Sequence, residues 1–192
     1  MTDFTHPLSG ASPPTGEHFT LHRSARSPGN QFVFTWTLAP GKSGPGEHRH
    51  PTETHNGDLL SGELAVWIDG KRHDVRAGEH FTIPAGASHR FKNFGKVPAV
   101  VVMANDGPMF EDFLVPIAIE MQKRGGKMSA RMFVQMMVQV QHTDVSKPSW
   151  RWRIPLALMS LIIWIFRLFG AKPLPPVHGW DHGAPPAPTH AA

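Results

Sequence analysis

Two histidine-bearing segments within residues 47–93 decide how this chain folds. The first, EHRHPTETH at residues 47–55, places His48 and His50 two positions apart and His55 five positions further on. The second, GEHFTIPAGASHRFKN at residues 78–93, supplies His89 after a Pro-x-Gly turn. Because alternate side chains of a strand point to the same face, His48 and His50 can face one side together. We expect the four histidines to converge on one metal ion.

Short strands separated by turn signals flank these histidines. Residues 31–38, QFVFTWTL, are aromatic and β-branched, which is typical of a strand. Asp69-Gly70 predicts a two-residue hairpin, because both central residues of such a turn need positive φ. Further short strands are expected within residues 56–104 at regular intervals. This spacing predicts an all-β barrel or sandwich.

The two histidine segments resemble the two motifs of the cupin family. The second cupin motif is a Gly, five residues, Pro-x-Gly, two residues, a His, three residues and an Asn. This chain matches every position, at Gly78, Pro84, Gly86, His89 and Asn93. The first motif, a Pro-Gly stretch followed by His-x-His and a later Gly, is matched by Pro40-Gly41, His48, His50 and Gly62. The resemblance covers residues 30–105 and implies a mainly β fold, a cupin (jelly-roll) barrel over residues 18–105 followed by C-terminal α-helices.

The chain departs from the first motif at one position. His55 stands seven residues before Gly62, where the family has a metal-binding Glu. The resemblance therefore implies four neutral imidazole ligands, His48, His50, His55 and His89, for a divalent transition metal (Fe, Ni, Cu, Zn or Mn). Glu53 is an alternative ligand, as a carboxylate two residues earlier. Another alternative is a barrel whose histidines bind no metal and only form hydrogen bonds.

Apolar residues on the expected strands indicate the lining of the barrel and the class of substrate. The candidates for this pocket are Phe34, Trp36, Trp67, Phe91 and Met103. An apolar mouth suits an aromatic or otherwise apolar small molecule. The first functional hypothesis is a metal-dependent oxygenase-type enzyme whose catalytic residues the sequence does not identify. The alternative is a non-catalytic module that binds a small ligand or metal and uses its C-terminal helices for membrane or partner contact.

The bulk properties exclude several classes of protein. The 192 residues are 40% hydrophobic, which suits one domain with appendages. The absence of cysteine excludes disulfides and thiolate metal sites, and it fits a cytoplasmic protein. The formal charge of +4 is spread along the chain, which argues against nucleic acid as a partner. Residues 1–17 lack the pattern of a secretory signal and are expected to form a flexible arm.

The C-terminal third has a different character, and we expect a helical extension over residues 106–170. Apolar residues at helical spacing predict a helix from residues 106–108 to Gly125-Gly126, with a kink or a division into two short pieces at Pro116, and a second helix after Ser129. The apolar stretch 154–169, flanked by Trp and basic residues, is a buried helix, a membrane-surface helix or a marginal membrane span. Membrane contact would use residues 150–170, and the same surface could form a homodimer. Residues 171–192 are expected to be a disordered tail.

Overall fold

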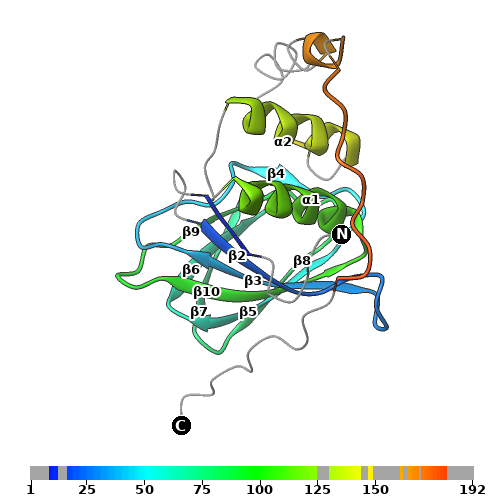
Figure 1. Cartoon of the computed structure of the whole chain (residues 1–192). Coiled ribbons are helices and arrows are strands. Elements are labelled where there is room, and N and C mark those ends of the chain that lie inside the picture. The colour runs from blue at the N-terminus through cyan, green and yellow to red at the C-terminus, as the bar shows by residue number, and fades with distance from the viewer. Residues whose placement is uncertain are drawn as a thin grey trace.

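A computed structural model describes residues 9–12, 17–124, 130–143, 147–148, 161, 164–168 and 170–180 of the chain (Figure 1). In this part of the chain, the strands form two sheets with antiparallel pairing throughout. Most of the expected N-terminal arm lies outside the described residues, although residues 9–12 form a strand at the edge of one sheet. The predicted mainly β fold with C-terminal helices is confirmed.

The first sheet has the spatial order β1 (Ser9–Ser12), β2 (Glu17–Arg23), β3 (Gln31–Leu38), β10 (Ala99–Asp106), β5 (His55–Ser61) and β8 (His80–Ile83). The second has the order β11 (Lys147–Pro148), β4 (His48–Arg49), β9 (His89–Lys92), β6 (Glu63–Ile68) and β7 (Lys71–Arg76). The two sheets face each other across one apolar interior (Figure 1).

Alternation along the central strands sets which side chains fill that interior. On β3, Phe32, Phe34, Trp36 and Leu38 are buried at every second position, as expected for one face of a strand. On β10 the matching series is Ala99, Val101, Met103 and Asn105, all buried and directly paired with residues of β3. This second series ends on a polar residue, which belongs to the site described below.

Two turns fix the register of the short strands. Asp69 and Gly70 have φ of 48° and 80°, so the predicted hairpin between β6 and β7 is confirmed. Gly62, between β5 and β6, has φ of +81°, and a Cβ there would lie 2.5 Å from the carbonyl oxygen of Pro98. Only glycine suits this second turn, because both the backbone conformation and the close approach exclude a side chain.

Two helices cover one end of the barrel, as Figure 1 shows. Helix α1 (Met109–Lys123) runs without interruption through Pro116 and packs its first turns on the barrel core. Helix α2 (Ala130–Thr143) lies on the far side of α1, where Met132 packs against Ile117 and Met121. The residue expected to cap α2, Ser129, lies outside the described residues. The order of layers is therefore barrel, α1 and then α2.

Residues 170–180, the C-terminal strap, return from α2 along α1 to the barrel (Figure 1). Leu174 donates its N–H to Oε1 of Gln139 at 2.9 Å, which fixes the strap to α2. At the end of the strap Trp180 is 1% exposed, and its Nε1–H donates to Oε1 of Glu111 at 3.0 Å. The sequence indicated a disordered tail from residue 171, but residues 171–180 are docked. Residues 181–192 lie outside the described part.

The apolar C-terminal stretch is described only at residues 161 and 164–168. Within it the large apolar side chains are exposed, and they are Leu161, Trp164, Ile165, Phe166 and Leu168. These described residues do not fit the buried-helix alternative, since they are exposed and lie at the end of the molecule away from the barrel (Figure 1). The described residues contain no helix that is both long enough and apolar enough to span a membrane.

Candidate metal centre

The four histidines come from three strand starts and one strand end at the same side of the barrel. His48 opens β4 and is the direct partner of His89, which opens β9. His50 follows β4 by one residue, and His55 opens β5. The Pro84-Ala85-Gly86 turn holds the two segments together, because the Gly86 N–H donates to the carbonyl oxygen of His50 at 2.7 Å. Residues far apart in sequence are thereby brought to one place.

Three of the four imidazoles form a compact group. One ring nitrogen from each of His48, His50 and His89 lies within 4.8 Å of the others. The Nε2 atoms of His48 and His50 are 3.2 Å apart. The ring centroids of His48 and His89 are separated by 4.4 Å. Two nitrogens on one ion lie at most about 4.2 Å apart, because each bond is about 2.0–2.1 Å long. The separations in this group are close to that limit, so small movements of the rings would bring all three nitrogens onto one ion.

Backbone carbonyl groups orient two of these rings. Nδ1 of His48 lies 2.7 Å from the carbonyl oxygen of Gly46, and Nδ1 of His89 lies 3.0 Å from that of Ala87. A carbonyl oxygen only accepts hydrogen bonds, so each Nδ1 carries the proton and each Nε2 of a neutral ring presents its lone pair. This outer hydrogen bond is the usual support of a metal-bound histidine.

His55 lies beside this group with its own free nitrogen. Its ring stacks on that of His50, with centroids 4.1 Å apart and an interplanar angle of 22°. Its Nε2 is buried and has no hydrogen-bond partner among the described residues. Such a group costs about 1–3 kcal/mol when it is left unsatisfied. The orphaned nitrogen is therefore suited to a ligand that the protein itself does not supply.

Burial keeps three of the imidazoles, those of His48, His55 and His89, neutral. Desolvation, assisted by the neighbouring His89 and His48, lowers the pKa of His55 to about 3. Desolvation and the nearby His48 lower the pKa of His89 to about 4. Burial likewise lowers the pKa of His48, partly opposed by the hydrogen bond to Gly46. Neutral imidazoles are the form that binds metal, so no proton has to be displaced near neutral pH.

Glu53 has a different role from the one that the alternative ligand hypothesis gave it. Its carboxylate accepts the N–H of Met109 at 2.5 Å and that of Phe110 at 3.1 Å. It therefore binds the free amides at the start of α1, where a helix leaves such donors unpaired. Desolvation raises the pKa of this carboxyl to about 7. Held by the helix in this way, Glu53 is not a member of the compact histidine group.

Four of the five predicted pocket residues face the barrel interior. Phe34, Trp36, Phe91 and Met103 are buried in the common core. The prediction for Trp67 is wrong, because its β6 neighbour Val66 faces inward and Trp67 faces outward. The guanidinium of Arg90 lies 3.7 Å from the centre of the Trp67 ring on that outer surface. Residues 64–68 of β6 are all apolar, so the sequence does not show which of them face the interior.

Two further residues adjoin the histidines and were not identified from the sequence. Phe110, in the first turn of α1, has its ring centroid 5.4 Å from that of His50 and 5.6 Å from that of His55. Asn105 is directly paired with His55 across β5 and β10 and is fully buried. The alternation Val101, Met103, Asn105 was a signal for the second residue, since it places a polar group at the end of an inward-facing series.

A cavity of about 470 Å³ adjoins the start of α1. Its lining includes Glu53, Gly107, Pro108 and Met109. Each of them lies within two residues of His55, Asn105 or Phe110 in the sequence. Phe110 stands between Met109 and the rings of His50 and His55. The cavity therefore lies beside the chain segments that carry the histidine group and Phe110, although none of these side chains is part of its lining.

Comparison with known proteins identifies the barrel. The Cupin domain family model matches residues 34–105. Germin-like protein 3-5 of Oryza sativa subsp. japonica is 43% identical over 75 residues, which are 35% of this chain and 33% of that protein. Oxalate oxidase 1 of Hordeum vulgare is 40% identical over 75 residues, 35% of this chain and 37% of that protein. The chain thus spans about a third of the length of these curated relatives.

Solved structures give a similar but partial match. A structure of oxalate oxidase is 31% identical and covers 56% of this chain and 59% of its own, with a TM-score of 0.45. A predicted oxalate decarboxylase from Thermotoga maritima is 21% identical and covers 55% of this chain and 97% of its own, also with a TM-score of 0.45. The family match, the two antiparallel sheets and the matched motifs agree that residues 34–105 of this chain form a cupin domain.

Proposed function

We propose that His48, His50 and His89 bind a divalent transition metal, with His55 as a fourth imidazole ligand. The observation that carries the proposal is the compact group of three ring nitrogens beside the buried, unpartnered Nε2 of His55. The donor set fits such an ion, because neutral imidazoles suit Fe, Ni, Cu and Zn better than Mg or Ca. Mn is the less favoured member of the expected set, since it prefers oxygen ligands.

We infer that this centre serves a metal-dependent oxidoreductase of the oxidase or oxygenase type that acts on a small molecule. A relative that is 40% identical over 75 residues carries the name oxalate oxidase, which supports this class of chemistry. A bound ion of this kind would supply Lewis acidity and, for Fe or Cu, electron transfer. The chain contributes the orientation of the rings, through Gly46 and Ala87, and an apolar, water-poor surrounding through Phe34 and Phe110.

Because position 55 has no carboxylate, fewer groups at the centre can accept a proton. Glu53 is engaged by the α1 backbone, so its carboxylate is not free to act as the base at the centre. The remaining groups at the site are neutral imidazoles and an amide. Phe91 packs against His89 and Phe34 packs against Phe110, so an apolar part of a substrate would find apolar surface beside the histidines.

Metal analysis and oxygen uptake test this proposal in separate steps. Untagged protein should retain about one transition-metal ion per chain, and the double variant His48→Ala/His50→Ala should retain none. The exposed His73 on β7 provides the matched control, His73→Ala, which should keep the metal. Oxygen consumption with small organic acids and phenols on Fe-, Cu- and Ni-loaded protein then tests catalysis. Metal-free wild-type protein would contradict the site, and flat oxygen traces would contradict the enzyme.

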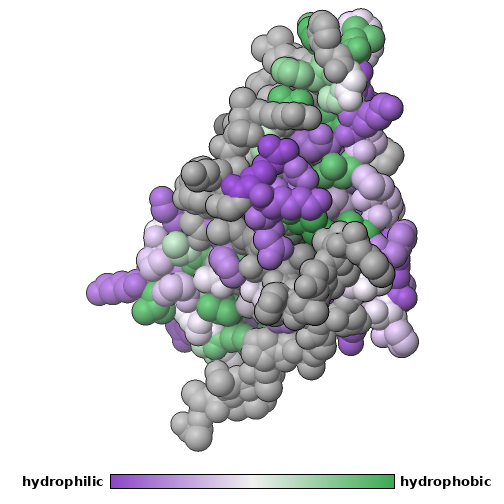
Figure 2. All heavy atoms as spheres, viewed as in Figure 1, coloured by the Kyte–Doolittle hydropathy of each residue, from purple (hydrophilic) through white to green (hydrophobic). Residues whose placement is uncertain are grey.

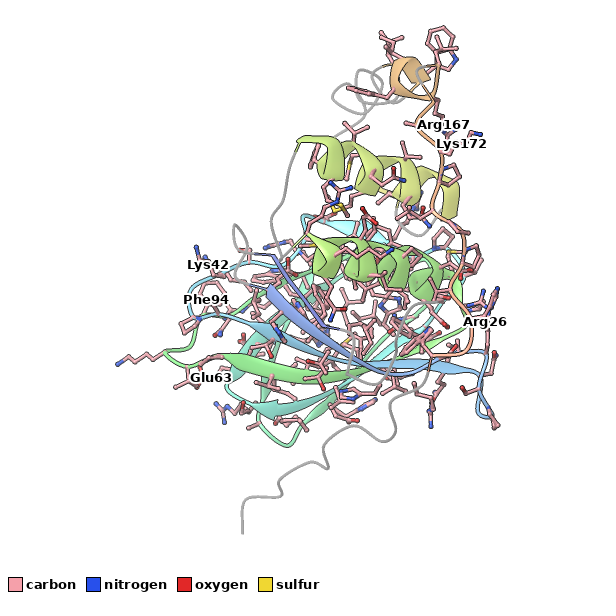
Figure 3. All side chains as sticks on the ribbon, in the orientation of Figure 1. Arg26, Lys42, Glu63, Phe94, Arg167 and Lys172 are labelled. Carbon is pink, nitrogen blue, oxygen red and sulfur yellow. The ribbon has the colours of Figure 1, made fainter. Side chains whose placement is uncertain are left out.

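The exposed apolar residues after α2 support a second candidate function, contact with an anionic lipid surface. Leu161, Trp164 and Leu168 are more than half exposed on the described part of this segment. Figure 2 shows hydrophobic spheres gathered at the end of the molecule where Figure 1 places these residues. Arg167 and Lys172 lie at the same end (Figure 3). Apolar side chains beside basic ones are typical of helices that lie in a membrane interface.

Vesicle sedimentation tests this second function. The full chain should bind vesicles that contain phosphatidylserine, and Trp164→Ser/Leu168→Ser should weaken that binding at least tenfold. Phe94 is 52% exposed on the barrel, away from Arg167 and Lys172 (Figure 3), so Phe94→Ser is the matched control. Equal binding by both variants would contradict lipid contact through this segment.

A further inference from the structure

Asn105 is a buried amide with no partner for either of its polar atoms. The residue is 0% exposed, and neither Oδ1 nor Nδ2 forms a hydrogen bond with any described residue. Buried amides are nearly always satisfied, because they lose their bonds to water on folding. An amide with both atoms unsatisfied therefore indicates a partner that is not part of the chain.

A second buried asparagine of the same barrel shows what a structural role requires. Asn93 is also 0% exposed, and its Nδ2 donates to the carbonyl oxygens of Leu38 and Val97 at 3.0 and 2.8 Å. Its Oδ1 accepts the N–H of Gly95 at 2.8 Å. Asn93 ties the loop after β9 to β3 with every hydrogen bond made. Asn105 lacks all such bonds, so the fold gives it no equivalent task.

The position of Asn105 directs its amide to the histidine centre. It lies directly opposite His55 across β5 and β10, and opposite Phe32 across β3 and β10. Side chains of directly opposed residues lie on the same face, with Cβ atoms about 4.5–5.5 Å apart. Because His55 and Phe32 are buried inside the barrel, Asn105 faces the same interior. The unsatisfied atoms of Asn105 and the unsatisfied Nε2 of His55 therefore share one region.

The chemistry of these groups indicates the class of molecule that fits. An amide needs a partner that both donates, to Oδ1, and accepts, from Nδ2, and besides water a hydroxyl group is the smallest group that does both. Four neutral imidazoles leave the charge of a divalent cation uncompensated in a buried place, which favours an anionic group on the ion. A small molecule with a carboxylate next to a hydroxyl meets both requirements at once.

A cavity also adjoins this part of the chain. Asp106 and Gly107, which follow Asn105 directly, line the cavity of about 470 Å³ at the start of α1. Phe110 covers His50 and His55 from the side of α1. The cavity wall thus continues in sequence into Asn105, and Phe110 follows the wall residue Met109.

We propose that the amide of Asn105 binds the hydroxyl group of a small hydroxy acid whose carboxylate lies at the metal centre. This inference rests on the proposed metal centre and names the class of substrate for it. Asn105 would select hydroxy acids over the matching acids that lack the hydroxyl, and it would hold the hydroxyl oxygen and its proton at a fixed place beside His55.

A binding experiment separates this proposal from the metal site itself. Protein loaded with Co²⁺ is titrated with glycolate and with acetate, and the change in its visible absorption gives both dissociation constants. The wild type should prefer glycolate at least tenfold. Asn105→Leu, which keeps the volume and removes both polar atoms, should reduce that preference to about one while it keeps the metal. Asn105→Ser, a smaller change, provides the same comparison if the leucine variant does not fold.

The outcomes distinguish failure of the metal centre from failure of the role proposed for Asn105. Wild-type protein that binds no Co²⁺ would overturn the metal centre and this inference with it. Protein that binds Co²⁺ but shows equal affinity for glycolate and acetate would overturn the role of Asn105 alone. An unchanged preference for glycolate in the folded Asn105 variants would do the same, and it would mean that the amide holds only a structural water.

Discussion

At the scale of single residues, the chemistry of the centre depends on position 55, where this chain has a histidine and the cupin motif has a glutamate. A carboxylate there would give the ion a negative ligand, whereas His55 leaves all four candidate ligands neutral. The stacked ring of His50 and the direct strand partner Asn105 then determine what surrounds that imidazole. The histidine at position 55 has two consequences. A bound ion receives no negative charge from its protein ligands, and the metal-free protein loses stability in acid.

The ligand at position 55 can be restored to a carboxylate to test the effect of this missing negative charge. We expect His55→Glu to shift the metal preference of the site from Cu and Ni towards Mn, because oxygen ligands suit the harder ion. The variant should also bind small carboxylates at least tenfold more weakly, since its own carboxylate reduces the charge at the ion. Competition between Mn²⁺ and Ni²⁺, followed by elemental analysis, measures the first effect. His55→Gln, which is neutral, is the control and should show no gain for Mn²⁺.

The lowered pKa of His55 predicts that the metal-free protein loses stability in acid. The unfolded chain takes up a proton on this imidazole below its ordinary pKa near 6.5, whereas the folded chain does so only near pH 3. Stability is therefore complete above about pH 6.5 and falls as the pH decreases towards 3. At about pH 5 this residue alone accounts for roughly 2 kcal/mol.

Urea unfolding of metal-free protein at about pH 7.5 and about pH 5 measures this loss. His55→Gln should make the two free energies of unfolding more nearly equal. His73→Gln changes an exposed histidine on β7 and should leave the difference as it is in the wild type. An equal acid sensitivity in both variants would contradict a buried, neutral His55.

At the scale of elements, the short strands depend on turns that hold a register. The β6–β7 hairpin needs positive φ at Asp69 and Gly70, and its turn is open on the outside. The β5–β6 turn at Gly62 is different, because the chain at Pro98 and Ala99 approaches it closely. The two glycines share a backbone conformation and differ in their surroundings, so they form a matched pair.

We predict that Gly62→Ala destabilises the protein more than Gly70→Ala does. At Gly70 a methyl group meets no atom within 4 Å, and only the left-handed conformation costs free energy, about 1–2 kcal/mol. At Gly62 the same cost is joined by a contact of 2.5 Å with the Pro98 carbonyl oxygen. The difference in the midpoint of urea unfolding measures the effect. Equal destabilisation would mean that the backbone at Pro98 moves away from the added methyl group at no cost in free energy.

At the scale of the whole molecule, the C-terminal strap joins parts that the sequence separates widely. Oε1 of Glu111 accepts hydrogen bonds from the Ser24 hydroxyl at 2.6 Å and from Trp180 Nε1 at 3.0 Å. Its Oε2 accepts the N–H of Ala25 at 2.8 Å. One buried carboxylate thus links the β2–β3 loop, α1 and the strap. The Trp180 ring also packs edge-on against Phe32 in the barrel, at 5.9 Å.

We expect Trp180→Ala to lower the free energy of unfolding by about 3–5 kcal/mol, the usual cost of removing a fully buried tryptophan. Trp164 is 58% exposed, so Trp164→Ala should change stability by less than about 0.5 kcal/mol. Thermal unfolding of the two variants beside the wild type gives the comparison. Equal and small effects would contradict the docking of the strap.

The sequence by itself determined the barrel, its hairpin turn and the identity of the histidines. Motif spacing carries this information, because a Pro-x-Gly turn and a His-x-His pair have geometric requirements that few residues meet. The inward direction of Phe34, Trp36, Phe91 and Met103 followed from the same strand alternation. The error at Trp67 arose because residues 64–68 are all apolar, so the sequence does not show which of them face inward.

Only the tertiary structure decided what the histidines and the C-terminal third contact. Gln139 is a polar residue of α2 that is buried, because it pairs with the strap at Leu174. Glu53 could be assigned to the start of α1 only once residues 53 and 109 were placed together. Likewise, the unsatisfied amide of Asn105 could be recognised only once β3, β10 and β5 were placed side by side. Local patterns fix elements and spacing, whereas the partners of a buried polar group depend on contacts between distant parts of the chain.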